Sequence, residues 1–249
     1  TEHAKFNKSL LSKLTKLMLA AEQAGMCVGI DVGKTCYVIV GKKIGAIYHV
    51  TQILKVRMKI DLSLTAQLLE LINSVKARKV VVDAGPDFEL VNNLKAKLGP
   101  RCNPCVYIPD VPKASAYYEV STQDKTLDVV SAQRTKGFDS LVETANASKF
   151  LYPECPETHE FRTHLKGMKR VEVMNKDGEL QARWQKVGTD HYMHALFYFK
   201  LACDILNAPN ASDVVAAPAA IVGVQIGSRQ QGRVAEGSTR NLVARYGVR

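Results

Sequence analysis

Short apolar runs separated by turns dominate the first half of the chain. Residues 26–32 (MCVGIDV) and 35–41 (TCYVIVG) are apolar and rich in β-branched residues, which predicts two strands joined by a turn at Gly33-Lys34. Residues 44–56 predict a third strand, so that the three form an antiparallel meander. Further strands are predicted over residues 79–85, 105–111 and 126–134.

Apolar residues recur at helical spacing between and after these strands. The spacing predicts helices over residues 62–77, 86–99 and 137–150. Residues 157–188 predict a short helix and then a hairpin, whose turn is NKDG. The last predicted helix covers residues 189–206 (TDHYMHALFYFKLACDIL), with Thr189 or Asp190 at its N-terminus.

This order of elements predicts an α/β fold with a mixed central sheet, in which an antiparallel three-strand meander joins parallel strands and helices flank both. An amphipathic helix within residues 1–25 is interpreted as a linker, and residues 26–206 as the folded domain. Residues 207–249 are rich in Ala, Gly and Arg with little periodicity, so we expect a flexible basic tail.

The composition allows a full hydrophobic core, because 46% of the 249 residues are apolar. Lys and Arg number 34 against 24 Asp and Glu, which gives a net charge of +10 and a pI near 9.3. This excess favours a polyanionic partner such as nucleic acid, although basic proteins without that role are common. Since no apolar run reaches the roughly 18 residues that span a bilayer, we expect no membrane partner.

The six cysteines are scattered through apolar stretches without the spacing of a disulfide framework, which is typical of a reducing compartment. Cys102 and Cys105 form a lone Cys-x-x-Cys pair. With Cys155 and His159 they would supply four zinc ligands, but a second close pair is missing and loop cysteines are the simpler interpretation.

Residues 25–35 (GMCVGIDVGKT) end in the letters of a phosphate-binding loop. That loop needs four residues between its two glycines, whereas Gly29 and Gly33 enclose three, and Val28 stands where a glycine is required. The carboxylate of Asp31 would also repel a phosphate. The pattern therefore argues against a P-loop and leaves Asp31 to be explained.

Three aspartates stand in three separate predicted elements: Asp31 in an apolar strand, Asp83 at the end of another, and Asp190 at the start of the last helix. An isolated buried carboxylate is costly, so each needs a partner such as a backbone amide, an arginine or a cation. Two strand-borne acids and one helix-borne acid can converge at one end of a sheet and hold divalent cations. Two-metal phosphodiester hydrolysis uses such oxygen ligands for Mg²⁺ or Mn²⁺, and a basic surface would hold the phosphate backbone.

In the order and spacing of three segments, the chain resembles the nuclease domain of tailed-phage large terminases, within the ribonuclease-H-like superfamily. The segments are VGIDVG, VVVDAGPD and GTDHYMHALFY, and the resemblance covers about residues 27–206. It implies a ribonuclease-H-like sheet and a metal-dependent endonuclease that cuts double-stranded DNA during viral genome packaging, with Asp31, Asp83 and Asp190 as catalytic ligands of two divalent ions, Mg²⁺ or Mn²⁺.

In the third segment Asp190 takes the position of the family's first acid and His191 follows it, as the family pattern has it, but His194 stands where relatives often have a second acid. If His194 binds the outer metal, its nitrogen should favour Mn²⁺ over Mg²⁺. The resemblance also implies an ATPase motor that is missing here, with residues 1–25 as the connector, the capsid portal and the small terminase as further partners, and the host cytoplasm as the location.

Other classes share parts of the pattern. Another ribonuclease-H-like DNA enzyme, a transposase or Holliday-junction resolvase, is the alternative, because transposases of one bacterial class open with a strand resembling GIDVGK. A sugar-kinase-like phosphotransferase would need a second acidic phosphate loop and a Gly-Gly adenosine motif, and neither is visible. A non-catalytic nucleic-acid-binding module would explain the charge but not the three aspartates.

Four other residues have simpler interpretations than a role in the site. Asp87 falls in the first turn of a predicted helix and is expected to interact with the helix dipole. Lys34 and Lys136 could approach a phosphate, but solvated lysines are commoner. Trp184 could stack on DNA, but a strand tryptophan more often packs in a core.

Overall fold

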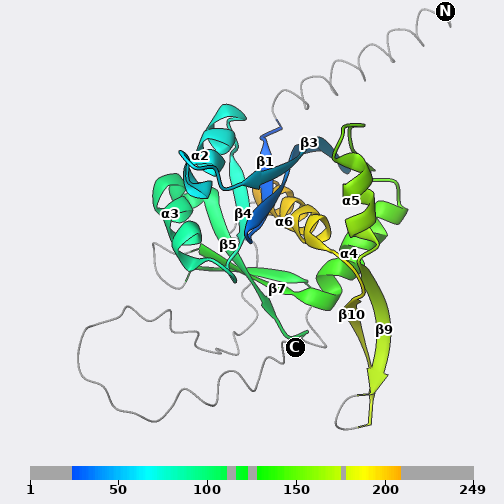
Figure 1. Cartoon of the computed structure of the whole chain (residues 1–249). Coiled ribbons are helices and arrows are strands. Elements are labelled where there is room, and N and C mark those ends of the chain that lie inside the picture. The colour runs from blue at the N-terminus through cyan, green and yellow to red at the C-terminus, as the bar shows by residue number, and fades with distance from the viewer. Residues whose placement is uncertain (1–23, 111–115, 123–127, 175–177, 209–249) are drawn as a thin grey trace, which may run out of the picture. The chain divides into compact units, whose positions relative to one another are not determined.

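An eight-stranded mixed sheet lies at the centre of the computed structural model, which describes residues 24–110, 116–122, 128–174 and 178–208 (Figure 1). These residues all belong to the first of two units into which the chain divides, Thr1–Pro209. Nearly all of the predicted linker (residues 1–25) and tail (residues 207–249) lies outside the described residues.

The strand order of the sheet is β6-β7-β5-β4-β1-β2-β3-β8. The strands β1, β2 and β3 pair antiparallel with one another. The pairs β1–β4, β4–β5 and β5–β7 are parallel. The mixed sheet predicted from the sequence, an antiparallel meander joined to parallel strands, is therefore confirmed. The bounds of these strands are β1 Cys27–Asp31, β2 Thr35–Ile44, β3 Ile47–Arg57, β4 Lys79–Asp83, β5 Cys102–Ile108 and β7 Asp128–Gln133.

Two strands at the edges of the sheet were not predicted. β6 (Tyr118–Thr122) pairs antiparallel with β7, and the two-residue β8 (Phe150–Leu151) pairs parallel with β3. The helix predicted over residues 137–150 is wrong at both ends, because α4 (Arg134–Asn146) follows β7 directly and residue 150 begins β8.

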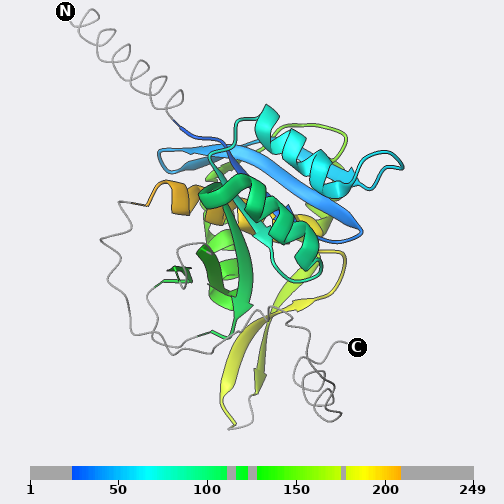
Figure 2. The same cartoon turned by 90° about the vertical axis from the view of Figure 1, so that its left-hand side faces the viewer.

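Helices cover both faces of the sheet, as Figures 1 and 2 show together. α2 and α3 pack on one face, where Val80 and Val82 of β4 join Leu68 and Leu94 in one buried cluster. α6 lies across the other face, together with α4 and α5. The helices are α2 Leu64–Ser74, α3 Phe88–Leu98, α4, α5 Thr158–Leu165 and α6 His191–Leu206, and a short 3₁₀ turn, η1 (Gly99–Arg101), follows α3.

The backbones of β1 and α6 come into close contact at Gly29. A Cβ atom placed there would lie 2.1 Å from the backbone nitrogen of Phe199 and 2.3 Å from the carbonyl oxygen of Ala195. Only glycine leaves room for this approach. Because α6 begins directly after Asp190, its position on β1 also determines where that carboxylate lies.

A separate two-stranded sheet, β9 (Met168–Met174) paired with β10 (Leu180–Lys186), confirms the predicted hairpin and extends away from the main sheet in Figure 1. Residues 175–177 of its turn lie outside the described residues. Asp139 of α4 anchors the hairpin, because it accepts hydrogen bonds from Arg170 Nε at 3.0 Å and from Trp184 Nε1 at 2.8 Å.

The cysteine pair has a different place from the one expected. Cys102 and Cys105 lie within β5 rather than in a loop. Cys102 packs in the cluster under α2 and α3, whereas Cys105 packs in the cluster under α6. The two thiols therefore face opposite sides of the sheet and cannot bind one zinc ion together.

Candidate active site

Two of the predicted acids stand side by side at the carboxyl ends of neighbouring strands. β1 and β4 are parallel, and Ile30 pairs with Val82, so Asp31 and Asp83 follow at the same edge of the sheet. Asp31 is buried. Burial raises the pKa of Asp83 above its ordinary value, and the nearby Asp31 carboxylate acts in the same direction. A cation at this edge would relieve the repulsion between the two carboxylates.

The third acid, Asp190, is buried at the N-terminus of α6, as predicted. Lys186 Nζ lies 2.7 Å from Asp190 Oδ1, and His194 Nε2 lies 3.3 Å from Oδ2. Burial opposes ionisation, but the hydrogen bonds from His194 and Lys186 outweigh it and hold the pKa of Asp190 well below its ordinary value. Both oxygens of this carboxylate therefore have side-chain partners.

His194 connects this acid with the strand-borne pair. It lies one helical turn after Asp190, and it is near enough to Asp83 to lower the pKa of that carboxyl. Its other ring nitrogen, Nδ1, lies 2.8 Å from the hydroxyl of Tyr107, near the end of β5. The structure thus brings Asp31, Asp83, Asp190 and His194 to the carboxyl edge of β1, β4 and β5.

His191 lies beside the first acid. Its Nδ1 is 2.8 Å from Asp31 Oδ2, and its ring stacks on Tyr37 with centroids 4.7 Å apart and an interplanar angle of 7°. The hydrogen bond to Asp31 raises the pKa of His191 above its ordinary value. Because the imidazole side chain is 41% exposed, it lies between the buried carboxylate and solvent.

The ligand chemistry of the site suits a hard divalent cation, because three carboxylates supply oxygen donors. Within the described ranges, however, no three His, Cys, Asp or Glu side chains are arranged closely enough to hold a metal ion as they stand. In the structure Asp31 instead contacts His191, and Asp190 contacts Lys186 and His194. The metal-ligand assignment of the four predicted residues stays a prediction.

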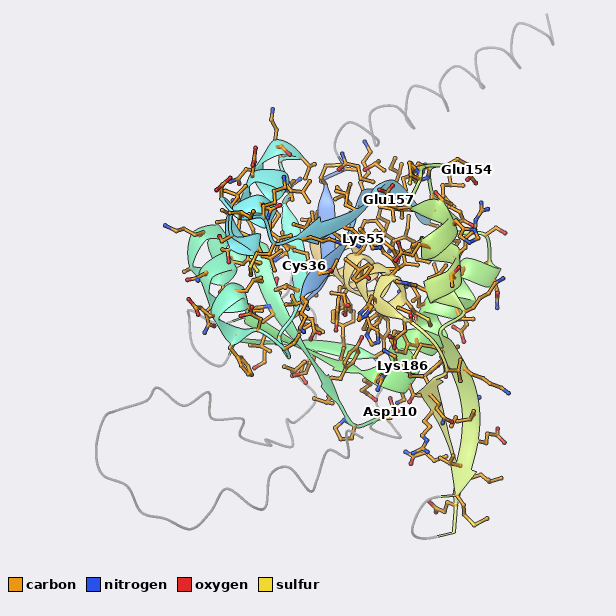
Figure 3. All side chains as sticks on the ribbon, viewed as in Figure 1. Cys36, Lys55, Asp110, Glu154, Glu157 and Lys186 are labelled. Carbon is orange, nitrogen blue, oxygen red and sulfur yellow. The ribbon has the colours of Figure 1, made fainter. Side chains whose placement is uncertain are left out.

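Sequence reasoning missed several neighbours of the acids. Lys186, which Figure 3 labels at the end of β10, reaches Asp190 because it precedes that residue by four positions. Tyr107 could have been found from the order of elements, because β5 is parallel to β4 and ends at the same edge. His164, whose Nδ1 accepts a hydrogen bond from the backbone amide of Tyr192 at 3.3 Å, carries no comparable signal.

Three of the four residues given simpler interpretations can be placed in the structure. Asp87 caps α3 by accepting a hydrogen bond from the amide of Leu90 at 3.0 Å, which confirms that it belongs to the helix terminus. Trp184 packs against Phe138 at the edge of the core. Lys34 is exposed in the turn between β1 and β2, and this turn leads into a strand rather than into the helix of a P-loop.

Comparisons with known proteins gave matches in structure only. No family model and no curated protein matches the sequence. The nuclease domain of the large terminase from thermophilic phage G20c is 15% identical, with 72% of this chain and 83% of that chain covered and a TM-score of 0.47. The nuclease domain of the large terminase subunit of bacterial virus Sf6 is 10% identical, with 70% of this chain and 86% of that chain covered and a TM-score of 0.45.

A longer large terminase, from a thermophilic bacteriophage, is 17% identical with a TM-score of 0.43, and the match covers 73% of this chain but 40% of that one. Among the described residues, no helix is long and apolar enough to cross a membrane.

Solved structures of the shorter domains contain magnesium, cobalt, manganese or calcium. The structure is thus similar to solved nuclease domains of phage large terminases, at low sequence identity.

Proposed function

We propose that this chain is a metal-dependent endonuclease that cuts double-stranded DNA. The observation that supports this most is the position of Asp31 and Asp83 at one edge of the sheet, on adjacent parallel strands, with His194 between that edge and Asp190 at the start of α6. Buried or partly buried carboxylates need a cationic or hydrogen-bonding partner, and a divalent cation would serve all three acids at once. The basic composition supplies attraction for a phosphate backbone.

Asp31, Asp83 and Asp190 are the residues that would hold the metal ions. When bound, two divalent ions supply an activated water and stabilise charge on the leaving oxygen. The side chains around the acids have their own tasks. Lys186 pairs with Asp190 while no metal is bound. His191 pairs with Asp31 in the same way, on the solvent side of the site.

The wider setting rests on the resemblance of the three motif segments to large terminase nucleases. We infer that cleavage serves viral genome packaging in the host cytoplasm, where the chain works with an ATPase motor, the capsid portal and the small terminase. In this arrangement residues 1–25 connect to the motor, residues 26–206 are the nuclease, and residues 207–249 form a basic tail that the chemistry does not need.

The proposal is tested by incubating the full chain with supercoiled plasmid and Mg²⁺, Mn²⁺ or Co²⁺, with and without chelator. Wild type should nick and linearise the plasmid only with metal. Asp31→Asn and Asp83→Asn should each reduce the rate at least a hundredfold while the circular dichroism spectrum and melting temperature are retained.

Asp87→Asn is the matched control, because it changes an aspartate only four positions after Asp83 that caps α3 instead of facing the site. Asn is an equally good N-cap, so this variant should cleave at the wild-type rate. Cleavage at the wild-type rate by either Asp31→Asn or Asp83→Asn would refute the proposed site. Metal-independent cleavage would refute the proposed chemistry.

A further inference from the structure

Tyr107, His194 and Asp190 form a series of polar side-chain contacts that runs from the core to the candidate site. The Tyr107 hydroxyl lies 2.8 Å from His194 Nδ1, and His194 Nε2 lies 3.3 Å from Asp190 Oδ2. The His194 side chain is only 12% exposed. Its ring is fixed on both sides, since the ring of Phe138 meets it edge to face at 5.1 Å and that of Tyr107 at 5.6 Å.

The partners of His194 decide which of its nitrogens carries the proton. An ionised carboxylate can only accept hydrogen bonds, so the contact with Asp190 requires a proton on Nε2. In a neutral imidazole the other nitrogen is then an acceptor, and the phenol of Tyr107 is the group that donates to it. Burial raises the pKa of Tyr107 well above its ordinary value, which keeps the phenol protonated.

We propose that Tyr107 is a positioning residue of the nuclease site, which fixes His194 in its Nε2–H tautomer so that His194 holds the Asp190 carboxylate in place. This inference rests on the proposed function, because Asp190 is there taken as a metal ligand. It also gives His194 a role other than the predicted one. With Nδ1 accepting from Tyr107 and Nε2 donating to Asp190, neither nitrogen has a lone pair for a metal.

The two roles of His194 predict opposite effects for Tyr107→Phe. If His194 orients Asp190, loss of the phenol hydroxyl frees the tautomer and weakens metal binding, about tenfold by comparison with other residues that orient metal ligands. If His194 binds the metal directly, the same substitution releases Nδ1, and the affinity for Mn²⁺ should stay the same or rise.

The first measurement needs no metal. Long-range ¹H–¹⁵N spectra of the full chain report the tautomer of each histidine, and His194 is assigned by its loss in His194→Gln. Wild type should show Nε2 protonated and Nδ1 unprotonated. In Tyr107→Phe the two ¹⁵N shifts of His194 should move toward each other as the tautomers mix. A wild-type His194 with its proton on Nδ1, or with shifts unchanged in Tyr107→Phe, would overturn the proposal.

The second measurement is the affinity for Mn²⁺ by titration calorimetry. His194→Gln keeps an N–H donor for Asp190 but has no tautomer, so it serves as the background in which Tyr107 has no tautomer left to fix. Tyr107→Phe should weaken binding about tenfold in the wild-type background and have no further effect in the His194→Gln background. A loss of the same size in both backgrounds would show that Tyr107 acts by packing alone, and it would overturn the proposal.

Two further variants keep the interpretation clean. Tyr117→Phe is the matched control, because it removes a tyrosine hydroxyl that donates to Asp204 at 2.7 Å, away from the three acids, and it should leave both readouts unchanged. Tyr198 lies with its ring 6.3 Å from that of His194, and its buried hydroxyl has no hydrogen-bond partner among the described residues. In the double variant Tyr107→Phe/Tyr198→Phe, the Tyr198 hydroxyl therefore cannot replace the Tyr107 hydroxyl as the hydrogen-bond donor to His194.

The two proposals fail in different ways. If wild type binds no Mn²⁺ and Asp31→Asn changes nothing, the proposed function fails, whereas the metal-free spectra still decide the role of Tyr107. If wild type binds Mn²⁺ and Tyr107→Phe binds it equally or more tightly, the nuclease proposal stands and the positioning role of Tyr107 is refuted.

Discussion

At Gly29 a single missing side chain lets α6 lie directly on β1. An added methyl group would overlap the backbone of α6 at Ala195 and Phe199, and a backbone cannot move aside as a flexible side chain can. We expect Gly29→Ala to lower the free energy of unfolding by about 3 kcal/mol or more, which is at the upper end for single substitutions. Urea denaturation of the purified chain measures this loss.

Gly33→Ala is the control for this prediction. A Cβ atom at residue 33 would lie 3.4 Å from its nearest neighbour, the carbonyl oxygen of Thr35, which is close to an ordinary contact. We expect a change of less than about 1 kcal/mol. Equal destabilisation by the two substitutions would show that the close approach of β1 and α6 is not what makes Gly29 necessary.

The residues of the candidate site could be predicted from sequence only where the local pattern carries them. Asp31 and Asp83 interrupt or end apolar runs, so their burial and their need for a partner follow from their neighbours in the chain. The partners themselves come from distant segments. His191 is 160 positions from Asp31, and Tyr107 is 87 positions from His194, so only the folded sheet brings them together.

The C-terminal end of α6 is joined to the meander by a second polar cluster. Asp204 accepts hydrogen bonds from Lys43 of β2 at 2.7 Å, from Tyr48 of β3 at 2.5 Å, from Tyr117 at 2.7 Å, and from Lys200, one turn earlier on α6, at 2.8 Å. Burial opposes ionisation here, but the Lys200 ammonium and these donors hold the pKa of Asp204 below its ordinary value.

Asp204→Asn should therefore destabilise the fold in a pH-dependent way. A carboxyl group whose pKa is lowered by folding stabilises the protein above its unfolded pKa of about 3.9, and this contribution is lost as pH falls through the folded pKa. We expect the difference in unfolding free energy between wild type and variant to be about 2 kcal/mol at pH 7 and to shrink below about pH 4.

Chemical denaturation at several pH values measures this difference. Glu154→Gln serves as the control, since Glu154 forms an exposed ion pair with Arg162, and loss of such a pair should cost less than about 1 kcal/mol at any pH. A difference between wild type and Asp204→Asn that stays constant from pH 7 to pH 3 would mean that the charge of Asp204 does not contribute.

Most elements were predicted because their patterns are local, and the exceptions have physical reasons. The meander, the parallel strands and the hairpin β9–β10 each carry a run of apolar or alternating residues bounded by turn residues. β8 has only two residues and gains its backbone partners from β3, so nothing in its own sequence distinguishes it from the end of a helix. Tertiary pairing, rather than propensity, defines this strand.

The charge of the whole molecule leads to a prediction about DNA. With a net charge of +10, we expect binding through the phosphate backbone, so unrelated duplexes should bind with similar affinity. Affinity should fall by about a thousandfold or more between 50 and 200 mM salt if six or more phosphates are contacted. Fluorescence anisotropy of labelled duplexes, in chelator to prevent cleavage, measures both properties.

Asp31→Asn, which removes one negative charge at the site without changing the rest of the surface, should show the same slope with salt. A preference of a hundredfold or more for one sequence at fixed salt would contradict backbone binding, and it would favour the transposase or resolvase alternative.

The pairing of the acids with Lys186 and His191 has a consequence for the life of the protein. In a site made of carboxylates without partners, repulsion between the negative charges would destabilise the fold until a metal ion bound, so folding would depend on the supply of metal. Here the charge is balanced from within. On the proposed function, the newly made chain would complete its fold without metal, and a metal ion would then bind at a site that is already formed.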